Sequence, residues 1–396
     1  MRFVHAKTIK QQHKGKNMQV EQGLWTSESN WEKPLTKNLS DSAQLMFVFG
    51  STSNFKNSVA IINEAKASYP NAKFLGCSTS GEIHGTEVYD ESFSFTAVQF
   101  DNTNVESAIV NVEDFSADSY VIGKELGTKL NKAGLKHVFI ISDGLNVNGT
   151  DLAKGLTEVL PSGVSITGGL AGDGANFNET RIILDDFIGS KHVAALGFFS
   201  EKLEVGYGSL GGWNGFGPIR EVTKSEGNVL FELDGKPALE LYKKYLGDQA
   251  KGLPGTGLLF PLNIKTSDRK QGLVRTILAV DEATQSMTFA GDIPQGAHVQ
   301  LMKANVDGLV DGAKGAADTV KENVQKETQL AILVSCVGRK LVMKQRTEEE
   351  VEEVLETLGE QTAVTGFYSY GELAPFKAGA NCELHNQTCT ITTFSE

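Results

Sequence analysis

The chain has 396 residues, which allows one to three domains and a large hydrophobic core. Its formal net charge of −12 argues against a protein that binds nucleic-acid backbones or anionic membrane surfaces. The sequence has no apolar run near the roughly 18 residues of a membrane span, and its first residues lack the apolar segment of a signal peptide. Because the four cysteines form no close pair, we expect a reducing, cytoplasmic environment.

Hydrophobic periodicity in the first hundred residues predicts a small α/β unit. We expect strands at Val4–Ile9, Leu45–Gly50 and Ser92–Phe100, with a helix at 55–69 between the second and the third. The polar segment 11–41 is predicted to be a loop with room for one helix.

The second hundred residues repeat this order. The pattern predicts strands at Val105–Val112 and His137–Ser142, and a helix with Ile122 and Leu126 on its apolar face lies between them. Thr150 is the expected cap of a second helix, and further strands follow in the region 180–200.

The segment Gly206–Gly217 holds six glycines, which indicate a hinge or a close approach of the backbone, and we expect the boundary between two domains, 1–215 and 216–396, to lie here. After it, the pattern predicts a third unit that begins with a strand at Val299–Met302. Its expected later elements are a helix along the apolar stripe from Val306 to Val324, a strand at Leu330–Cys336, a helix with a Thr347–Glu350 capping box, and a final strand at Thr388–Phe394.

One short segment recurs in all three units, at 74–83, 166–174 and 364–373. Each copy has an apolar strand end, a glycine, a small or polar loop, a second glycine and an acid. The repeat predicts an α/β fold of three related units, each in the order strand, helix, strand, helix, strand, turn, strand. The segments are either tight turns or a ligand-binding loop formed by Gly76, Cys77, Ser78, Gly81, Gly168, Gly172, Asp173, Gly366, Gly371 and Glu372.

The chemistry-bearing residues of these loops favour a structural role over catalysis. Cys77 has no histidine that the sequence brings close to it, so a Cys-dependent hydrolase is the weakest of the functions considered and we expect no enzyme. The acids Glu82, Asp173 and Glu372 recur at one place in separate units, which predicts that they accept backbone N–H bonds.

His385 is the histidine of most interest, because it lies beside the last glycine segment. Cys382, His385 and Cys389, with Cys336, have a spacing that resembles zinc ligands, but strand alternation argues against a shared site. His385 is either a hydrogen-bonded structural residue or the ligand of a metal or haem, and His298 is the second candidate.

The walls of such a pocket are expected to come from aromatic residues near the third glycine segment. The candidate aromatic residues are Phe367, Tyr368, Tyr370 and Phe376, and the candidate polar residues are Asp143, Ser335, Arg339 and Glu372.

Several motifs resemble those of FIST proteins. The segments LMFVFGS (45–51), LGCSTSGEI (75–83), ISDG (141–144) and TGGLAGD (167–173) resemble the N-terminal half of that family. The C-terminal half is matched by LDGKPALELY (233–242), LLFPL (258–262), SCVGRKLVMKQRTEEEVEEV (335–354), GFYSYGELAP (366–375) and LHNQTCTITTF (384–394).

The resemblance implies a sensory, ligand-binding protein of signal transduction. Some stand-alone bacterial members of the family bind haem b, sense nitric oxide and regulate a partner histidine kinase. On that likeness we expect a haem site with His385 as the metal ligand, and His298, Tyr368 and Arg339 as further cofactor-binding candidates. The alternative is a FIST sensor of a small organic ligand, such as an amino acid, without haem.

Overall fold

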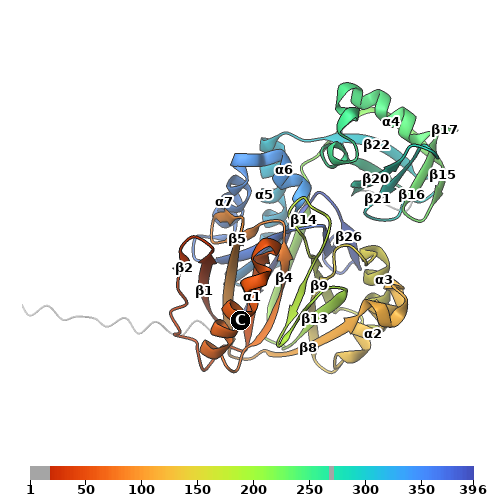
Figure 1. Ribbon diagram of the computed structural model, residues 1–396. Coiled ribbons are helices and arrows are strands. Elements are labelled where there is room, and N and C mark those ends of the chain that lie inside the picture. Colours follow the sequence, from red (N-terminus) through yellow and green to blue (C-terminus); the bar gives the residue numbers. More distant parts are fainter. Residues whose placement is uncertain (1–17, 267–271) are drawn as a thin grey trace, which may run out of the picture.

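The computed structural model describes residues 18–266 and 272–396 of the chain (Figure 1). The strand expected at Val4–Ile9 lies outside the described residues. The protein has a larger core, built from three mixed sheets with helices, and a smaller lobe of residues 214–303 that lies at one end of the core. The predicted α/β class is confirmed.

Three units with the same sheet order are present, as predicted, but the described part of the first unit has one α-helix instead of the expected two. In each unit, two neighbouring strands are parallel, a third strand is antiparallel to them, and a fourth is antiparallel to the third, in the orders β4-β3-β7-β1, β10-β9-β13-β8 and β24-β23-β27-β14. The first unit consists of β1 (Met18–Thr26), β2 (Asn30–Lys33), β3 (Leu45–Ser51), α1 (Phe55–Ser68), β4 (Lys73–Thr79) and β7 (Ser92–Phe100). The second consists of β8 (Asn104–Asn111), α2 (Ser119–Lys129), β9 (Leu135–Ser142), α3 (Gly149–Val159), β10 (Ser165–Leu170) and β13 (His192–Phe199). The third consists of β14 (Glu204–Leu210), α5 (Val306–Asn323), β23 (Leu330–Cys336), α6 (Val337–Met343), α7 (Glu348–Leu358), β24 (Ala363–Ser369) and β27 (Cys389–Ser395).

The glycine-rich segment provides a close approach of the backbone, one of the two features that its composition indicates. It contains β14, the first strand of the third unit, which pairs along its length with β27. Helix α5 packs so closely on β14 that a Cβ atom on Gly208 would lie 2.1 Å from the carbonyl oxygen of Ala316. The glycines therefore allow close approach of a helix, and the strand expected at Val299–Met302 belongs to the lobe instead.

Other local predictions also fail for identifiable reasons. The segment 11–41, expected to be a loop, includes strands β1 and β2. The prediction failed because buried polar residues interrupt the apolar pattern of the strand. One of them is Glu21, which accepts hydrogen bonds from Tyr69 and from the backbone of Leu39. Helix α3 is capped by Asn148 and not by Thr150.

The repeated glycine segments are the places where the chain leaves one sheet for another. Each is followed by a hairpin that extends the sheet of a different unit, so that the exchange is cyclic. The first unit's hairpin joins the third sheet, the second unit's joins the first, and the third unit's joins the second. The hairpins are β5–β6 (Glu82–His84 and Glu87–Tyr89), β11–β12 (Ile182–Leu184 and Phe187–Gly189) and β25–β26 (Gly371–Pro375 and Cys382–His385).

Aromatic residues from all three sheets meet in the centre of the core. The ring of Phe47 lies 5.6 Å from that of Phe139, and the ring of Phe49 lies 4.8 Å from that of Phe367, measured between centroids. The helices of each unit cover the opposite face of its sheet with separate apolar clusters.

The lobe forms a further sheet, and in the sequence it is inserted between β14 and α5. Its strands and its helix are β15 (Asn214–Glu226), β16 (Val229–Leu233), β17 (Lys236–Pro237), α4 (Ala238–Leu246), β18 (Leu262–Lys265), β19 (Leu273–Arg275), β20 (Ile277–Asp281), β21 (Ser286–Phe289) and β22 (His298–Lys303). Gln387, in the turn between β26 and β27, joins the lobe to the core. Its amide nitrogen donates to the carbonyl of Leu258 at 2.9 Å and to the hydroxyl of Thr276 at 3.0 Å.

Candidate functional site

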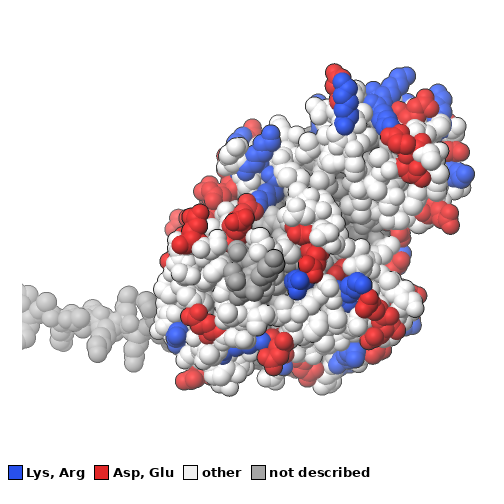
Figure 2. All heavy atoms as spheres, in the orientation of Figure 1, with Lys and Arg blue, Asp and Glu red and all other residues white. Residues whose placement is uncertain are grey.

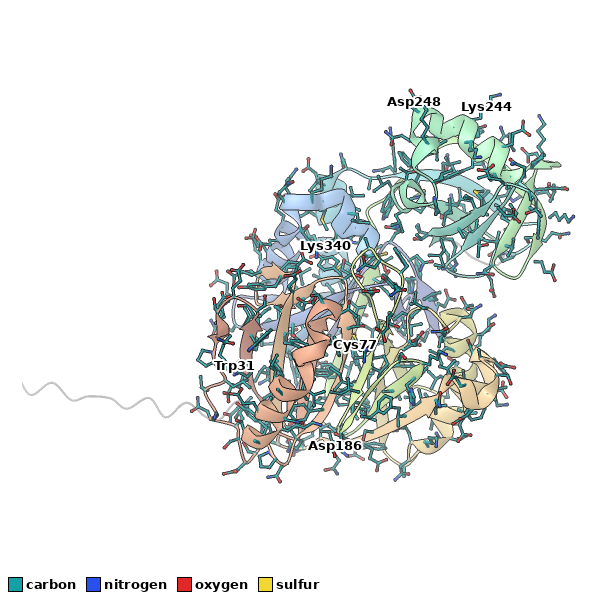
Figure 3. All side chains as sticks on the ribbon, viewed as in Figure 1. Trp31, Cys77, Asp186, Lys244, Asp248 and Lys340 are labelled. Carbon is teal, nitrogen blue, oxygen red and sulfur yellow. The ribbon has the colours of Figure 1, made fainter. Side chains whose placement is uncertain are left out.

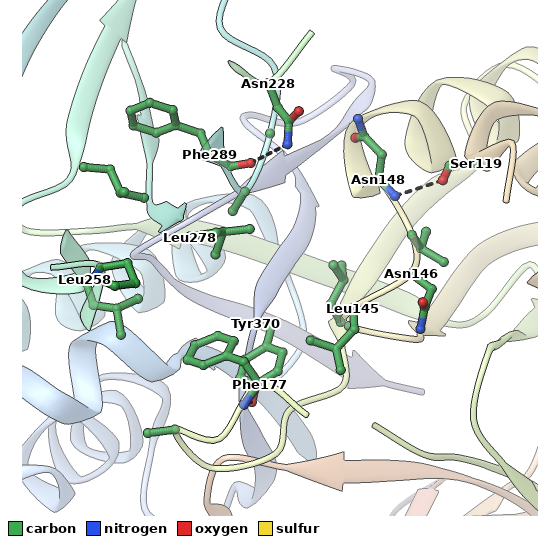
Figure 4. Close-up of a pocket in the computed structure, with 18 of the residues that line it drawn as sticks. Ser119, Leu145, Asn146, Asn148, Phe177, Asn228, Leu258, Leu278, Phe289 and Tyr370 are labelled. Atoms are coloured by element: carbon green, nitrogen blue, oxygen red, sulfur yellow. Dashed lines mark hydrogen bonds between the residues drawn. The ribbon is translucent and has the colours of Figure 1, made fainter. Parts of the chain in front are cut away.

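A pocket of about 800 Å³ lies where the lobe meets the core (Figure 4). This volume is within the range of small-molecule sites. Its walls come from the start of α2, the loop after β9, the loop after β10, helix α6, the end of β24, and four segments of the lobe.

The loop after β9 is held rigidly by its own side chains. The carboxylate of Asp143 accepts the backbone N–H groups of Leu145 and Asn146 at 2.9 and 2.7 Å. Asn148 accepts the N–H of Thr150 and so begins α3. The pocket wall at 144–148 is therefore formed before any ligand arrives.

The loop after β10 presents an aromatic ring to the pocket. Asp173 accepts the N–H groups of Asn178 and Glu179, which fixes the loop around Phe177. Phe177 has a left-handed backbone (φ +52°), and its N–H donates to the hydroxyl of Tyr370 at 3.1 Å. The rings of Phe177 and Tyr370 are stacked, with centroids 4.3 Å apart and planes at 14°. Strained backbone held by several contacts is typical of binding sites.

The opposite wall belongs to the lobe and is apolar. Leu258, Leu278 and Phe289 line it (Figure 4). Leu341 of α6 lines the pocket from the core. Asn228 is fixed there, because its amide nitrogen donates to the carbonyl of Phe289 at 2.7 Å.

The pocket gathers apolar side chains that the fold leaves in contact with solvent. Leu145, Phe177 and Leu278 are 37%, 36% and 44% exposed, and all three line it. Exposed apolar groups that cluster in a concavity mark a binding site. Of the described residues that line the pocket, none is charged. On the face shown in Figure 2, charges of both signs are spread over core and lobe without a large patch of one sign.

The predicted cofactor residues are not brought together. His385 is buried, donates a hydrogen bond from Nε2 to the carbonyl of Ala374 (3.0 Å), and lines a separate cavity of about 220 Å³ with Phe376. His298 is exposed on β22, at the surface of the lobe. Tyr370 alone among the proposed aromatic wall residues reaches the large pocket.

Arg339 and Tyr368 are sealed inside the core. Both bind Glu350, which turns inward instead of forming the predicted capping box with Thr347. The Nε of Arg339 donates to Glu350 at 3.0 Å, and Ser335 donates to the same carboxylate at 2.9 Å. This cluster is part of the fold and does not face either cavity.

The residues around the pocket do not fit a haem group. Haem iron takes histidine, cysteine, methionine or tyrosine as its axial ligand. Among the described lining residues only Tyr370 is of these types, and its hydroxyl is engaged with Phe177. Burial raises the pKa of Tyr370 to about 12, so this hydroxyl is neutral. The described residues also hold no group of three or more His, Cys, Asp and Glu side chains able to bind a metal ion.

Cys77 lies on β4 inside the core (Figure 3) and is fully buried. Burial, with a smaller effect of the Glu82 charge, raises the pKa of its thiol well above the ordinary value. A neutral buried thiol is a poor nucleophile, which argues against the Cys-dependent hydrolase.

Two of the recurring acids are buried carboxyl groups at equivalent places. Glu82 accepts bonds from Thr79 and from the backbone and hydroxyl of Ser92. Glu372 accepts the corresponding bonds from Ser369 and Thr388. They do accept backbone N–H bonds, as expected, but these N–H groups belong to residues at or directly before the start of the next core strand and not to the glycine loop.

Burial raises the pKa of Glu372 from 4.5 to about 8, against the opposing effect of its hydrogen-bond donors. The folded state therefore keeps a proton that the unfolded chain has already lost. The contribution of this group to stability is complete below pH 4.5 and is lost as the pH rises to about 8. We expect the melting temperature to fall across this window, and to fall less steeply in Glu372→Gln. An equally steep curve for the variant would show that Glu372 does not titrate there.

Sequence reasoning did not identify most of the pocket. Asn146 and Asn148 follow the ISDG motif, where the sequence has the residue types of a turn and a helix cap. These local patterns could have identified both residues. The lobe residues Leu258, Leu278 and Phe289 have no such signal, because only the folded chain brings them to the core.

Comparisons with known proteins agree with this architecture. The FIST N domain family model matches residues 44–236, and the FIST C domain family model matches residues 238–375. The uncharacterized protein MJ1623 of Methanocaldococcus jannaschii is 24% identical over 321 residues, which are 74% of this chain and 60% of that protein.

Two solved structures resemble the chain over nearly its whole length. They are a chorismatase (9% identity, 96% of this chain and 99% of that one) and the cyanuric acid hydrolase of A. caulinodans (7% identity, 95% and 98%). Both have TM-scores of 0.35, a likeness that says nothing about the substrate or mechanism of this chain. Among the described residues, no helix combines the length and the apolar character of a membrane span. Because the two domain families together match most of its length, the chain belongs to the FIST family.

Proposed function

We propose that this chain is a sensory protein that binds a small organic molecule in the pocket between core and lobe. FIST domains are ligand-binding modules of signal transduction. The observation that carries the proposal is the pocket itself, whose opposite walls come from two parts of the chain and expose three apolar side chains to solvent.

A ligand that touches both walls can report its presence by fixing the lobe. It would favour the arrangement in which Leu278 of the lobe and Phe177 of the core are both in contact with it. Leu258 connects the pocket to the rest of the core, because its carbonyl accepts the amide of Gln387. Thr388, the next residue, binds Glu372 in the third glycine segment.

The partner that receives the signal is a histidine kinase or another signalling protein of the cytoplasm, which reads the altered surface of core and lobe. Haem and nitric oxide remain the prediction that the family likeness makes, and the donor groups of the pocket do not favour them. An organic ligand is therefore the better-supported choice.

A thermal-shift screen of the full chain with hemin, the amino acids and small neutral aromatic compounds tests this proposal. We expect an aromatic compound to raise the melting temperature with increasing concentration, and Phe177→Ala to abolish the increase. A stoichiometric Soret band from bound hemin, altered in His385→Ala, would contradict the choice of an organic ligand.

A further inference from the structure

We infer that the pocket takes an uncharged, flat and mostly apolar molecule, such as a neutral heteroaromatic compound. This inference rests on the proposed ligand-binding function and specifies the chemistry of the ligand. It excludes free amino acids and other zwitterions as the preferred ligand, as well as carboxylates.

A charged ligand would find no side chain of opposite charge among the described residues that line the pocket. None of the described lining residues carries a charge, and a buried ion is costly unless an opposite charge or several hydrogen bonds compensate for it. The N-terminus of α3 offers no substitute for a cation, because Asn148 already accepts the N–H groups of Thr150 and Asp151.

The carboxylates of the surrounding segments are engaged by other groups. Asp143 is 1% exposed and binds the loop after β9. Asp173 is 5% exposed and binds the loop around Phe177. Asp292 pairs with Lys154 at 3.4 Å. A cationic ligand would have to break these contacts to find a partner.

The aromatic wall of the pocket has a shape that fits a planar ligand. Phe177 stacks on Tyr370 at 4.3 Å and remains 36% exposed. A planar ligand can continue this stack, and aromatic pairs contribute attraction beyond the apolar area that they bury. Leu258, Leu278 and Leu341 supply apolar contacts around the same pocket.

The polar side chains of the pocket are neutral: three amides and the hydroxyls of Ser119 and Tyr370. Asn146 and Asn228 use their amide nitrogens to bind Asp143 and the carbonyl of Phe289. No bond to either side-chain oxygen is found among the described residues, so both oxygens can accept a ring N–H or a hydroxyl. Such groups orient a neutral heterocycle without requiring it to carry a charge.

Three compounds of one shape test the inference: indole, the anion indole-3-acetate and the cation tryptamine. Titration calorimetry on the full chain should show indole binding at least tenfold more tightly than either charged analogue. Phe177→Ala should weaken the binding of indole at least tenfold. An unchanged melting temperature of this variant without ligand would show that it is folded.

A charge placed in the pocket should reverse the preference. Leu145→Lys adds a cation at a position that is 37% exposed, and it should bind indole-3-acetate more tightly than indole. Ile219→Lys, at an exposed residue of β15 outside the pocket, is the matched control and should behave as the original protein.

The outcomes separate the two proposals. Tighter binding of a charged analogue to the unaltered protein, weakened by Phe177→Ala, would overturn the ligand class and leave the pocket as the binding site. Failure of all three compounds to bind at millimolar concentration would overturn the inference that the ligand is a neutral, flat and apolar molecule. Persistence of any observed binding in Phe177→Ala, with no response to Leu145→Lys, would overturn the pocket assignment as well.

Discussion

Glu350→Ala should lower the free energy of unfolding by about 3–5 kcal/mol, the usual effect of removing one partner from a buried ion pair. The side chain of Arg339 is 0% exposed, and that of Glu350 is 1% exposed. Without the carboxylate, the guanidinium would keep only backbone acceptors, including the carbonyl of Leu309 at 2.8 Å. Ser335 would lose its acceptor too. Urea denaturation at neutral pH measures the change.

Glu349→Ala is the matched control for this variant. Glu349 is the preceding residue of α7 and pairs with Arg346 at the surface, where both side chains are more than a third exposed. An exposed pair of this kind contributes little, so its denaturation midpoint should not move measurably. Equal effects of the two variants would show that the buried cluster does not stabilise the fold.

Gly168→Ala should destabilise the protein by about 2–5 kcal/mol, through backbone strain and overpacking together. Gly168 is the first glycine of the second repeated segment and has φ +144°. A Cβ atom there would lie 1.8 Å from the carbonyl oxygen of Ile140 on the neighbouring parallel strand. The backbone of β9 would have to move, and with it the loop that forms the pocket wall.

Comparison with Gly163→Ala separates the effect of backbone strain from that of the steric collision of a Cβ atom. Gly163 also has a positive φ (+90°), but no atom lies within 4 Å of the position of its Cβ. Its variant should therefore be less destabilised than Gly168→Ala. The same comparison applies to Gly366, where the Cβ would lie 1.9 Å from the carbonyl oxygen of Leu333. Equal losses at Gly163 and Gly168 would mean that the close strand contact has no energetic consequence.

The repeat of the fold was predictable because its signals are local. Apolar periodicity at Leu45–Gly50 and at Leu330–Cys336 marks strands that the structure contains with nearly the same bounds. The glycine segments were also recognisable, but the exchange of hairpins between sheets was not. It depends on which sheet edge each hairpin reaches, and no sequence pattern within one unit carries that information.

The glycine-rich sequence left a hinge and a close approach of the backbone equally open, for a physical reason. The run at Gly206–Gly217 has the composition of a flexible connection, yet its glycines are needed where α5 packs on β14. Close packing and conformational freedom favour the same residue, so composition alone cannot separate them.

The candidate site was only partly predictable. Tyr370 belongs to a motif beside the third glycine segment and does line the pocket, whereas Arg339 in the same unit is enclosed by Glu350. A charged residue near an apolar strand is compatible with a binding site or with a buried pair. The lobe wall, with Leu278, depends on contacts between segments about a hundred residues apart and has no local signature.

Hydrogen–deuterium exchange of the full chain, with and without saturating indole, tests ligand binding between core and lobe most directly. Indole should slow exchange at 144–148 and 174–178 of the core and, at the same time, at 277–291 of the lobe. Protection confined to the segment around His385, or to one wall alone, would contradict a ligand that bridges the two parts of the protein.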